Sequence, residues 1–234
     1  MNLNYAIYDY QTAVFNGIGE PDGEMELKAH DFGLGFRLGA LYELTSMTRF
    51  GLSYNSSSQR QALLPIGVRN KPVTLESKFP QRVTVRAWHQ FADGKSVTLD
   101  VVWVDFSQFG LSSATVGDTS IPVTDAHYNN IWATTVGANW PLDEKWTLRF
   151  GAAYVSSGVD TQNRSFSFRL DRVVGAAAGA EYRWSKDRVV GANLNYYDLG
   201  SAPVNANIPL VGTLSGQYTS NYAIGLDVTL RWIR

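Results

Sequence analysis

The sequence predicts an all-β protein, an antiparallel up-and-down transmembrane β-barrel of the outer-membrane type with about ten strands in this chain. Two observations predict it. Apolar and polar residues alternate with a period of two along most of the sequence, as side chains do on the two faces of a strand. Short polar turns and long loops alternate between these segments, which is typical of outer-membrane barrels. We therefore expect residues 1–234 to form a single transmembrane β-barrel domain.

The segment Gln217–Trp232 shows the pattern most clearly. One of its faces is aliphatic in the middle and aromatic at both ends, and it consists of Tyr218, Ser220, Tyr222, Ile224, Leu226, Val228, Leu230 and Trp232. The residues between them are polar or small. A strand that crosses a bilayer places aliphatic side chains against the lipid tails and Tyr or Trp at the headgroups. This segment is therefore expected to face lipid on one side and a barrel lumen on the other.

About ten segments follow this period rather than the helical one. In chain order they are Asn2–Gln11, Asp31–Leu44, Thr48–Ser57, Gln81–Ala92, Val97–Phe109, Ile131–Trp140, Trp146–Ser156, Arg172–Trp184, Arg188–Leu199 and Gln217–Trp232. The first of them has the weakest pattern. An open sheet would leave two unpaired edges in lipid, which lipid does not tolerate. If the chain folds alone, we therefore expect Asn2–Gln11 to pair with Gln217–Trp232. If it belongs to a larger barrel, we expect that pairing to be poor or absent.

The connections alternate in length along the whole chain. The short ones are Thr45–Met47, Asp93–Ser96, Leu142–Lys145 and Ser185–Asp187, and the long ones are 12–30, 58–80, 110–130, 157–171 and 200–216. In outer-membrane barrels the short turns are periplasmic and the long loops are external. The alternation therefore predicts a multi-pass protein of the cell outer membrane, of the Gram-negative type, with both termini on the periplasmic side.

Composition excludes several other classes. The chain has no cysteine, which excludes disulfides and cysteine-based metal sites. Its net charge is -1 without a basic block, so no nucleic-acid partner is expected. The longest apolar run, Val173–Ala180, is far shorter than the roughly 20 residues of a spanning helix. The first five residues lack the basic start and apolar stretch of a signal peptide, so we expect that one was removed or that the chain is a fragment.

Charged residues fall mainly on the positions expected to face the lumen, because charge is expensive in lipid. The candidates for lumen charges are Arg37, Arg49, Arg86, Arg149, Glu181 and Asp227. One interpretation is a paired, hydrated network that supports the barrel. The other is that some arginines bind the carboxylate of a ligand in transit through two hydrogen bonds. Small inward residues would leave room in the lumen for a passage or a plug, although glycine is also common in any tilted barrel wall. They are Gly33, Gly35, Gly39, Gly151, Ala153, Gly175, Ala177, Gly179 and Gly191.

The long loop at 58–80 contains the candidate substrate-binding residues Leu63, Leu64, Ile66 and Val68. Apolar side chains in an external loop indicate a contact surface for a hydrophobic ligand. The alternative is that they pack on a neighbouring loop.

Catalysis has little support in the sequence. His127 and Asp125 lie together in the loop at 110–130, but no nucleophile is singled out beside them. We expect no catalytic residue, no metal site and no cofactor, and therefore no enzyme activity. An outer-membrane hydrolase that uses His127 is the weakest of the alternatives.

Several segments share their order and spacing with a known family. They are Asp31–Tyr42, Thr48–Tyr54, Pro80–Val85, Phe91–Asp93, Val97–Trp103, Trp146–Tyr154, Asp187–Gly191 and Asn193–Tyr196. Together they resemble the FadL/TodX family of outer-membrane transporters for long-chain fatty acids and other hydrophobic compounds. The resemblance runs from about residue 24 to the end of the chain.

The resemblance implies a barrel of about fourteen strands with an N-terminal hatch, within the size range of such barrels. It implies passive passage of a hydrophobic ligand, captured first on external apolar loops. This chain resembles the C-terminal part of such a protein, without the hatch and the first strands. The implied partners are the lipid bilayer, a long-chain fatty acid or other hydrophobic ligand, and the outer-membrane assembly machinery; we expect a monomer. The alternative function is a structural or adhesive outer-membrane barrel without transport activity.

Overall fold

The computed structural model describes residues 2–14, 23–64, 73–116, 118–121, 127–166, 168–208 and 212–232. These residues form antiparallel strands and one short 3-10 turn at Phe106–Gln108. No helix among them is long and apolar enough to cross a membrane. The strands are β1 (Asn2–Val14), β2 (Gly23–Gly35), β3 (Arg37–Thr45), β4 (Thr48–Asn55), β5 (Ser58–Leu64), β6 (Val73–Phe79), β7 (Arg82–Gln90), β8 (Ser96–Val104), β9 (Gly110–Val116), β10 (Thr119–Ile121), β11 (Ile131–Pro141), β12 (Trp146–Val155), β13 (Val173–Ser185), β14 (Arg188–Asp198), β15 (Val204–Ile208), β16 (Gly212–Gly216) and β17 (Tyr222–Trp232).

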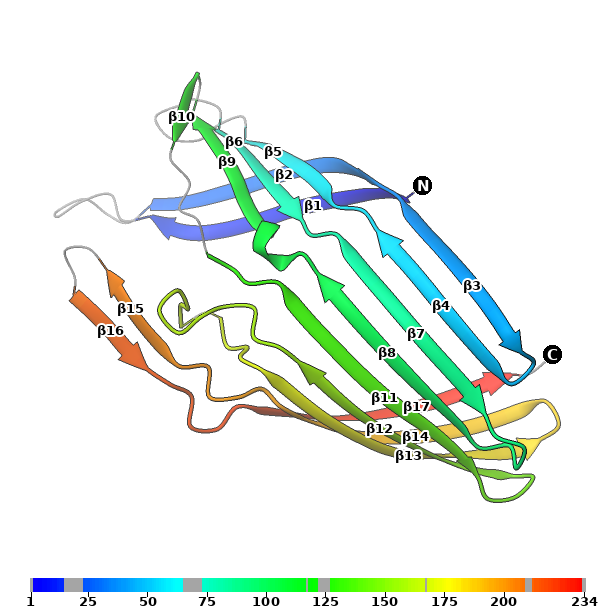
Figure 1. The fold of residues 1–234 in the computed structure, drawn as a ribbon. Helices are drawn as coiled ribbons and strands as arrows, with labels where there is room; N and C mark the ends of the chain where they lie inside the picture. The colour runs from blue at the N-terminus through cyan, green and yellow to red at the C-terminus, as the bar shows by residue number, and fades with distance from the viewer. Residues whose placement is uncertain are drawn as a thin grey trace. The chain divides into compact units, whose positions relative to one another are not determined.

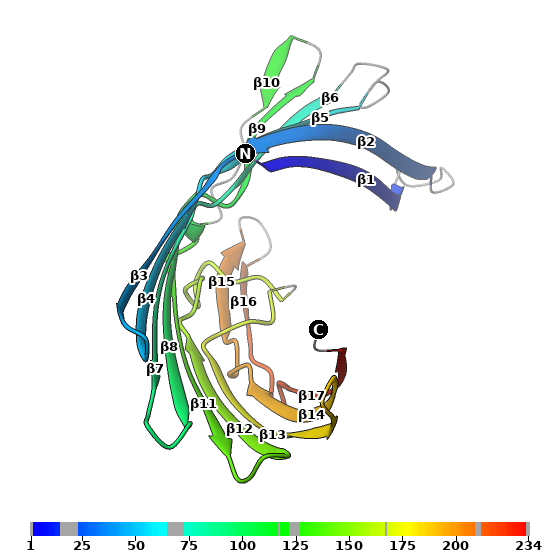
Figure 2. The same ribbon diagram turned by 90° about the vertical axis from the view of Figure 1, so that its right-hand side faces the viewer.

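The largest sheet has nine strands in the order β17-β14-β13-β12-β11-β8-β7-β4-β3. Strands that follow one another within this sheet are neighbours, so it is an up-and-down meander (Figure 1). The sheet curves from β3 to β17 (Figure 2). The pairing of β14 with β17 is continuous from Arg188↔Trp232 to Asp198↔Tyr222, whereas the register of β13 and β14 shifts between Arg183 and Ser185. The predicted all-β antiparallel meander is therefore confirmed.

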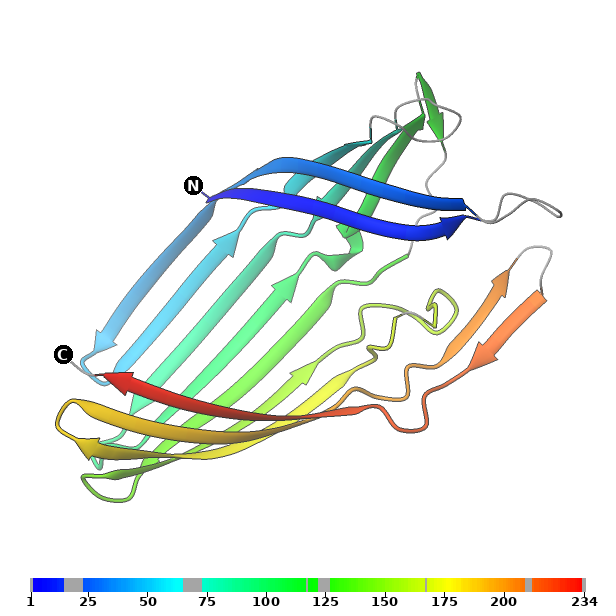
Figure 3. The ribbon, with the colours of Figure 1, turned by 180° about the vertical axis from the view of Figure 1, so that it is seen from behind.

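The chain divides into two compact units. One comprises residues 1–37, 55–81 and 108–126 and holds the β1–β2 hairpin and a sheet of order β10-β9-β6-β5. The other comprises residues 38–54, 82–107 and 127–234 and holds the nine-stranded sheet almost entirely. It also contains the β15–β16 hairpin, which continues past the ends of β14 and β17 (Figure 3).

One face of the nine-stranded sheet is apolar and exposed. Leu226 and Val228, in the middle of β17, are 71% and 72% exposed. Rings lie near both ends of the strands on this face: Trp132 and Trp140 on β11, and Trp146 and Tyr154 on β12, are all exposed. Large apolar side chains exposed across a whole sheet face are expected where lipid is the solvent. The predicted lipid-facing pattern of the strands is therefore present in the structure.

Side-chain oxygens close the short turns by accepting hydrogen bonds from nearby backbone N–H groups, the usual role of Asp, Ser and Thr in tight turns. Thr45 Oγ1 accepts from the Met47 N–H (3.2 Å), Asp93 Oδ1 from the Lys95 N–H (3.2 Å), and Asp143 Oδ1 from the N–H groups of Lys145 and Trp146 (both 2.7 Å). The two backbone donors at Asp143 hold the pKa of that carboxyl below its usual range. The carboxyl group of Asp187 also has a lowered pKa, because the Ser185 hydroxyl donates to it.

The largest fully buried side chains of the described chain, Arg164 and Val159, lie outside the nine-stranded sheet. Val159, Ala202 and Val204 are 2% exposed or less, and Arg164 is 2% exposed. Through Nη2, Arg164 donates to Ser157 Oγ (2.8 Å), Val159 O (2.9 Å) and Asp171 Oδ1 (2.9 Å), and through Nη1 to Pro203 O (2.9 Å). A single guanidinium therefore joins the loop at 157–171 to the loop that begins at residue 199. We call this arrangement the Arg164 clamp.

Aromatic packing extends the same loop region. The ring of Tyr128 lies 5.0 Å from that of Phe106 and 5.7 Å from that of Phe168, measured between centroids. Residue 158 is glycine, which has no Cβ. A Cβ at this position would lie only 3.0 Å from the side chains of Phe106 and Ile131. These loops thus have a small core of their own.

The pairing expected of a chain that folds alone, and one of the predicted strand bounds, were wrong. Asn2–Gln11 pairs with β2, not with the last strand, and β17 is bonded only to β14 among the described strands. The predicted segment Asp31–Leu44 is divided at Phe36, whose N–H bonds to Ser56 Oγ and whose carbonyl accepts from the Ser56 N–H (both 2.9 Å).

Four of the five long connections contain strands that were not predicted. Connections 58–80, 110–130 and 200–216 contain the paired strands β5, β6, β9, β10, β15 and β16, and 12–30 contains most of β2 and the end of β1. Antiparallel hairpins satisfy backbone groups whether or not side chains alternate, so the hydrophobic pattern gave no signal for them.

Candidate functional site

The face opposite the apolar one carries the charged residues of the sheet, and most of these are paired across strands. Arg86 of β7 and Asp100 of β8 are cross-strand partners, and the guanidinium meets both carboxylate oxygens, with Nη2 2.8 Å from Oδ2. Thr135 of β11 adds a long hydrogen bond of 3.5 Å to the same carboxylate. A two-point contact fixes the orientation of both side chains. The positive charge of Arg86 is therefore already paired with the Asp100 carboxylate.

Two arginines share one carboxylate further along the sheet. Arg149 Nη2 lies 2.6 Å from Glu181 Oε1, and Arg231 Nη2 lies 3.4 Å from Glu181 Oε2. The Glu181 side chain is only 13% exposed, whereas Arg231 is about half exposed. Arg149 Nε is buried and has no hydrogen-bond partner among the described residues. Two positive charges around one negative charge give this cluster a surplus positive charge.

The remaining candidate charges also have polar partners. Arg49 Nε lies 2.9 Å from Glu43 Oε1, and its guanidinium lies 5.1 Å from the centroid of the Trp88 ring. Asn195 donates to the Asp227 carboxylate at 2.5 Å. Arg37, in the other compact unit, donates to the Asn55 side-chain oxygen. The structure thus pairs all six predicted lumen charges; their role toward a ligand stays a prediction.

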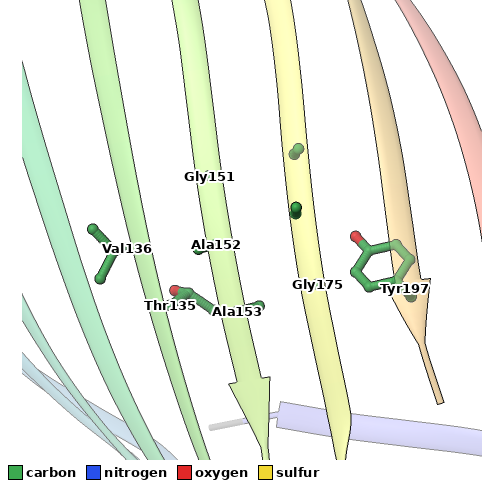
Figure 4. Close-up of a pocket in the computed structure, with 9 residues that line it drawn as sticks. Thr135, Val136, Gly151, Ala152, Ala153, Gly175 and Tyr197 are labelled. Carbon is green, nitrogen blue, oxygen red and sulfur yellow. The ribbon is translucent and has the colours of Figure 1, made fainter. Parts of the chain in front are cut away.

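A hollow of about 170 Å³ interrupts this charged face. Thr135 and Tyr197 stand at its edges, and glycine and alanine residues of β12 and β13 form its floor (Figure 4). The floor consists of Gly151, Ala153, Gly175 and Ala177 on this face, with Val136, Ala152 and Ala176 also contributing.

The small residues are required where the Tyr197 ring crosses the sheet. Gly175 is the cross-strand partner of Tyr197, and a Cβ at Gly175 would lie 2.8 Å from Cδ1 of that ring. Real side-chain contacts do not come that close, so a larger residue would displace the ring. An aromatic ring over a glycine in the neighbouring strand is a known way to cover such a gap. Tyr197 therefore bounds the hollow because position 175 is glycine.

Four of the nine small inward residues noted in the sequence line this hollow, whereas Tyr197 was not predicted to lie there. The pair Tyr196–Tyr197 is the sequence feature that could have predicted a ring on the charged face. Successive residues in a strand point to opposite faces, so one of the two rings had to be on the charged side. The outward ring, Tyr196, is exposed and stacks near Tyr222 with centroids 6.1 Å apart.

The structure describes two of the four predicted substrate-binding residues of the loop at 58–80. Leu63 and Leu64 belong to β5, where their partners are Thr74 and Val73. Ile66 and Val68 lie outside the described residues, so the predicted ligand contact of this loop stays a prediction. Asp125 also lies outside them, which leaves the His127–Asp125 pair untested. In the described part of the chain no group of His, Asp and Glu side chains has the arrangement of a metal site.

Comparison with known proteins identifies the family. The family described as "Outer membrane protein transport protein (OMPP1/FadL/TodX)" matches residues 3–232. The long-chain fatty acid transport protein of Escherichia coli K12 is 26% identical over 214 residues, which cover 82% of this chain and 48% of that protein. The chain thus spans about half the length of the curated relatives it matches. The predicted resemblance is confirmed.

Solved structures show the same fold. A FadL homologue from Pseudomonas aeruginosa aligns with a TM-score of 0.73 at 17% identity, covering 97% of this chain and 61% of that one. The toluene transporter TbuX of Ralstonia pickettii aligns with a TM-score of 0.56 at 19% identity, covering 96% of this chain and 55% of the other. The predicted fold class, an outer-membrane β-barrel, is thereby confirmed.

Proposed function

The chain belongs to the outer membrane protein transport family described as OMPP1/FadL/TodX. We propose that it forms part of the wall of a passage for hydrophobic compounds across the outer membrane. The observation that carries the proposal is the two-sided sheet. One face exposes aliphatic side chains between two levels of aromatic rings, and the other combines paired charges with an apolar hollow. A passage for amphipathic molecules needs both a lipid-compatible exterior and such an interior.

The hollow gives the hydrophobic part of a ligand a place on the inner wall. Its floor of glycine and alanine lets an alkyl chain or a ring approach the backbone closely, and the Tyr197 ring supplies an apolar surface at its edge. Such contacts depend on shape rather than on fixed hydrogen bonds. We infer that passage is passive, with no catalytic step and no cofactor.

The surplus charge near Glu181 suits the other end of a fatty acid. Arg149 and Arg231 already share one carboxylate, and a ligand carboxylate would provide the second anion. Arginine binds carboxylates well because its N–H groups match both oxygens. A long-chain fatty acid is therefore the proposed substrate class, with uncharged hydrophobic compounds as the alternative that the hollow alone would serve.

Uptake of a radiolabelled long-chain fatty acid in a strain without its own transporter tests the proposal. The strain should produce this protein in its outer membrane. Ala177→Trp fills the hollow and should reduce uptake strongly, whereas Ala178→Trp, one residue further along β13 on the opposite face, should not. Absence of rescue by the unmodified protein, with normal amounts in the outer membrane, would refute transport.

A structural or adhesive barrel is the second candidate, and the packed loops around Arg164 favour it, since ordered external loops suit a surface for contact. This function predicts that deleting the gene of this protein leaves fatty-acid uptake unchanged. It also predicts that removing residues 157–171 reduces cell attachment.

A further inference from the structure

A larger hollow lies on the opposite, lipid-facing side of the sheet. It has a volume of about 420 Å³ and a lining that is almost entirely apolar. Ala87 of β7 lies in its middle, opposite Leu99 of β8, while Phe50 of β4 and Val136 of β11 line it from the two flanking strands. All four strands belong to the same compact unit.

The hollow exists because a small residue interrupts a face of large ones. On β7 the outward positions are Val85, Ala87 and His89, and alanine leaves a gap between the other two. Val85, Leu99 and Phe50 around it are each between 42% and 49% exposed. The gap therefore opens directly onto the surface that contacts the lipid tails. Nothing among the described side chains fills it.

A polar pair lies at one end of the hollow. Thr48 Oγ1 and His89 Nδ1 are 2.9 Å apart, and the imidazole also contacts the Phe91 ring, with centroids 4.7 Å apart. These residues adjoin the short turns at the ends of the strands. At the same level, Lys95 Nζ lies 4.0 Å from the centroid of the Trp140 ring. Aromatic, imidazole and ammonium groups together are typical of the headgroup level of a bilayer.

We propose that this hollow is a binding site for one acyl chain of a bilayer phospholipid, with the Thr48–His89 pair next to the ester and phosphate groups of that lipid. The hollow is continuous with the lipid-contacting face, so the bilayer itself supplies the occupant. Its apolar wall gives water no hydrogen-bond partners, whereas a flexible acyl chain fills an irregular space and gains dispersion contacts. The polar pair and Lys95 lie at the end where the headgroup belongs. A lipid held here is distinct from any ligand on the inner face.

Photocrosslinking in vesicles tests the proposal. The full chain is inserted into vesicles of phosphatidylethanolamine and phosphatidylglycerol that contain a phosphatidylethanolamine with a diazirine in its acyl chain. After illumination, crosslinked residues are mapped by mass spectrometry. Crosslinks should concentrate at Phe50, Ala87 and Leu99 rather than at exposed positions of the same face such as Leu194 and Leu226. Even labelling of all these positions would overturn the proposal.

Substitutions that fill the hollow test whether it causes the preferential crosslinking at these residues. Ala87→Trp should lower the crosslink yield at Phe50 and Leu99 about tenfold, since excluding two methylene groups from a site weakens binding by roughly that factor. Leu99→Trp fills the hollow from another strand and should lower the yield at Phe50 in the same way. The matched control is Ala178→Trp, on the same face between Phe150 and Leu194, which should leave the yield unchanged.

Two results decide against a bilayer lipid. If excess free oleic acid removes the crosslinks from the hollow while the vesicles stay intact, the site belongs to a transported compound. If both tryptophan variants retain full crosslinking, with the heat-modifiable gel mobility of a folded barrel, the hollow does not select a lipid. These readouts do not involve uptake, so they stand independently of the proposed transport function.

Discussion

Replacing Arg164 with alanine tests whether a single guanidinium holds two loops together. Its side chain is 1% exposed and donates four hydrogen bonds, one of them to the Asp171 carboxylate at 2.9 Å. Removing one partner of a buried ion pair typically costs about 3–5 kcal/mol, because the other charge and the carbonyl acceptors remain without a partner. Since the Asp171 side chain is 24% exposed and can regain water, we expect the lower end of that range.

The cost should appear as local opening of the loops and not as loss of the sheet. Residues 157–171 and 199–206 should exchange their amide hydrogens about 100-fold faster, which corresponds to roughly 3 kcal/mol of local stability. The strands β13 and β14 should keep their protection. Hydrogen exchange followed by mass spectrometry measures both in the same sample.

Arg169→Ala is the matched control, since Arg169 lies in the same loop. It is exposed, and its guanidinium lies 5.8 Å from the centroid of the Tyr218 ring, an interaction worth at most about 1 kcal/mol at the surface. Arg164→Lys retains the charge but not the fork of donors and should behave nearly like the alanine variant. Unchanged exchange in Arg164→Ala, or an equal effect of Arg169→Ala, would refute the clamp.

Three further predictions concern the sheet and its turns. Glu181→Gln leaves its two arginine partners without an anion, so oleate binding measured by isothermal titration should tighten about tenfold; unchanged or weaker binding would exclude the cluster as a carboxylate site. Gly175→Val should destabilise the barrel by about 1–3 kcal/mol in urea, because its Cβ clashes with the Tyr197 ring, and Tyr197→Ala should remove part of that penalty, whereas additive effects would contradict the contact. The Asp143 carboxyl has a lowered pKa in the folded chain, so its contribution to turn stability is complete above the pKa of the unfolded chain and disappears as the pH falls through the folded value. Asp143→Asn should therefore narrow the stability difference between pH 7 and acidic pH in urea unfolding, and an unchanged pH dependence would argue against the turn bond.

The strands of the large sheet could be predicted from sequence because lipid and lumen impose opposite demands on successive residues. In β17, for example, Ile224, Leu226 and Val228 alternate with small or polar residues, and the structure exposes all three. Short turns were equally clear, since Asp and Thr residues that accept backbone hydrogen bonds stand in them. The alternation of apolar and polar residues therefore predicted the strands, and the turn residues predicted the short turns.

Pairing between distant segments could not be predicted in the same way. The expectation that Asn2–Gln11 joins the last strand followed from the need to satisfy sheet edges, but a nearer partner, Gly23–Gly35, satisfies the same backbone groups. The cost of closing a loop grows with its length, so a hairpin competes well with a distant strand. Arg164 was missed because a lone arginine in a polar loop has no periodic pattern, and its burial depends on residues from two loops.

The two levels of aromatic rings also have a consequence for the membrane around the protein. Trp132 and Trp140 are eight residues apart on β11, or about 27 Å along an antiparallel strand. At a tilt of about 40°, this corresponds to a hydrocarbon layer of only about 20 Å. A bilayer thicker than this distance must thin next to the sheet, at a cost of fractions of a kcal/mol per Å of mismatch. The outer membrane is thinner than most bilayers, so the spacing of these tryptophans favours residence there over residence in the inner membrane.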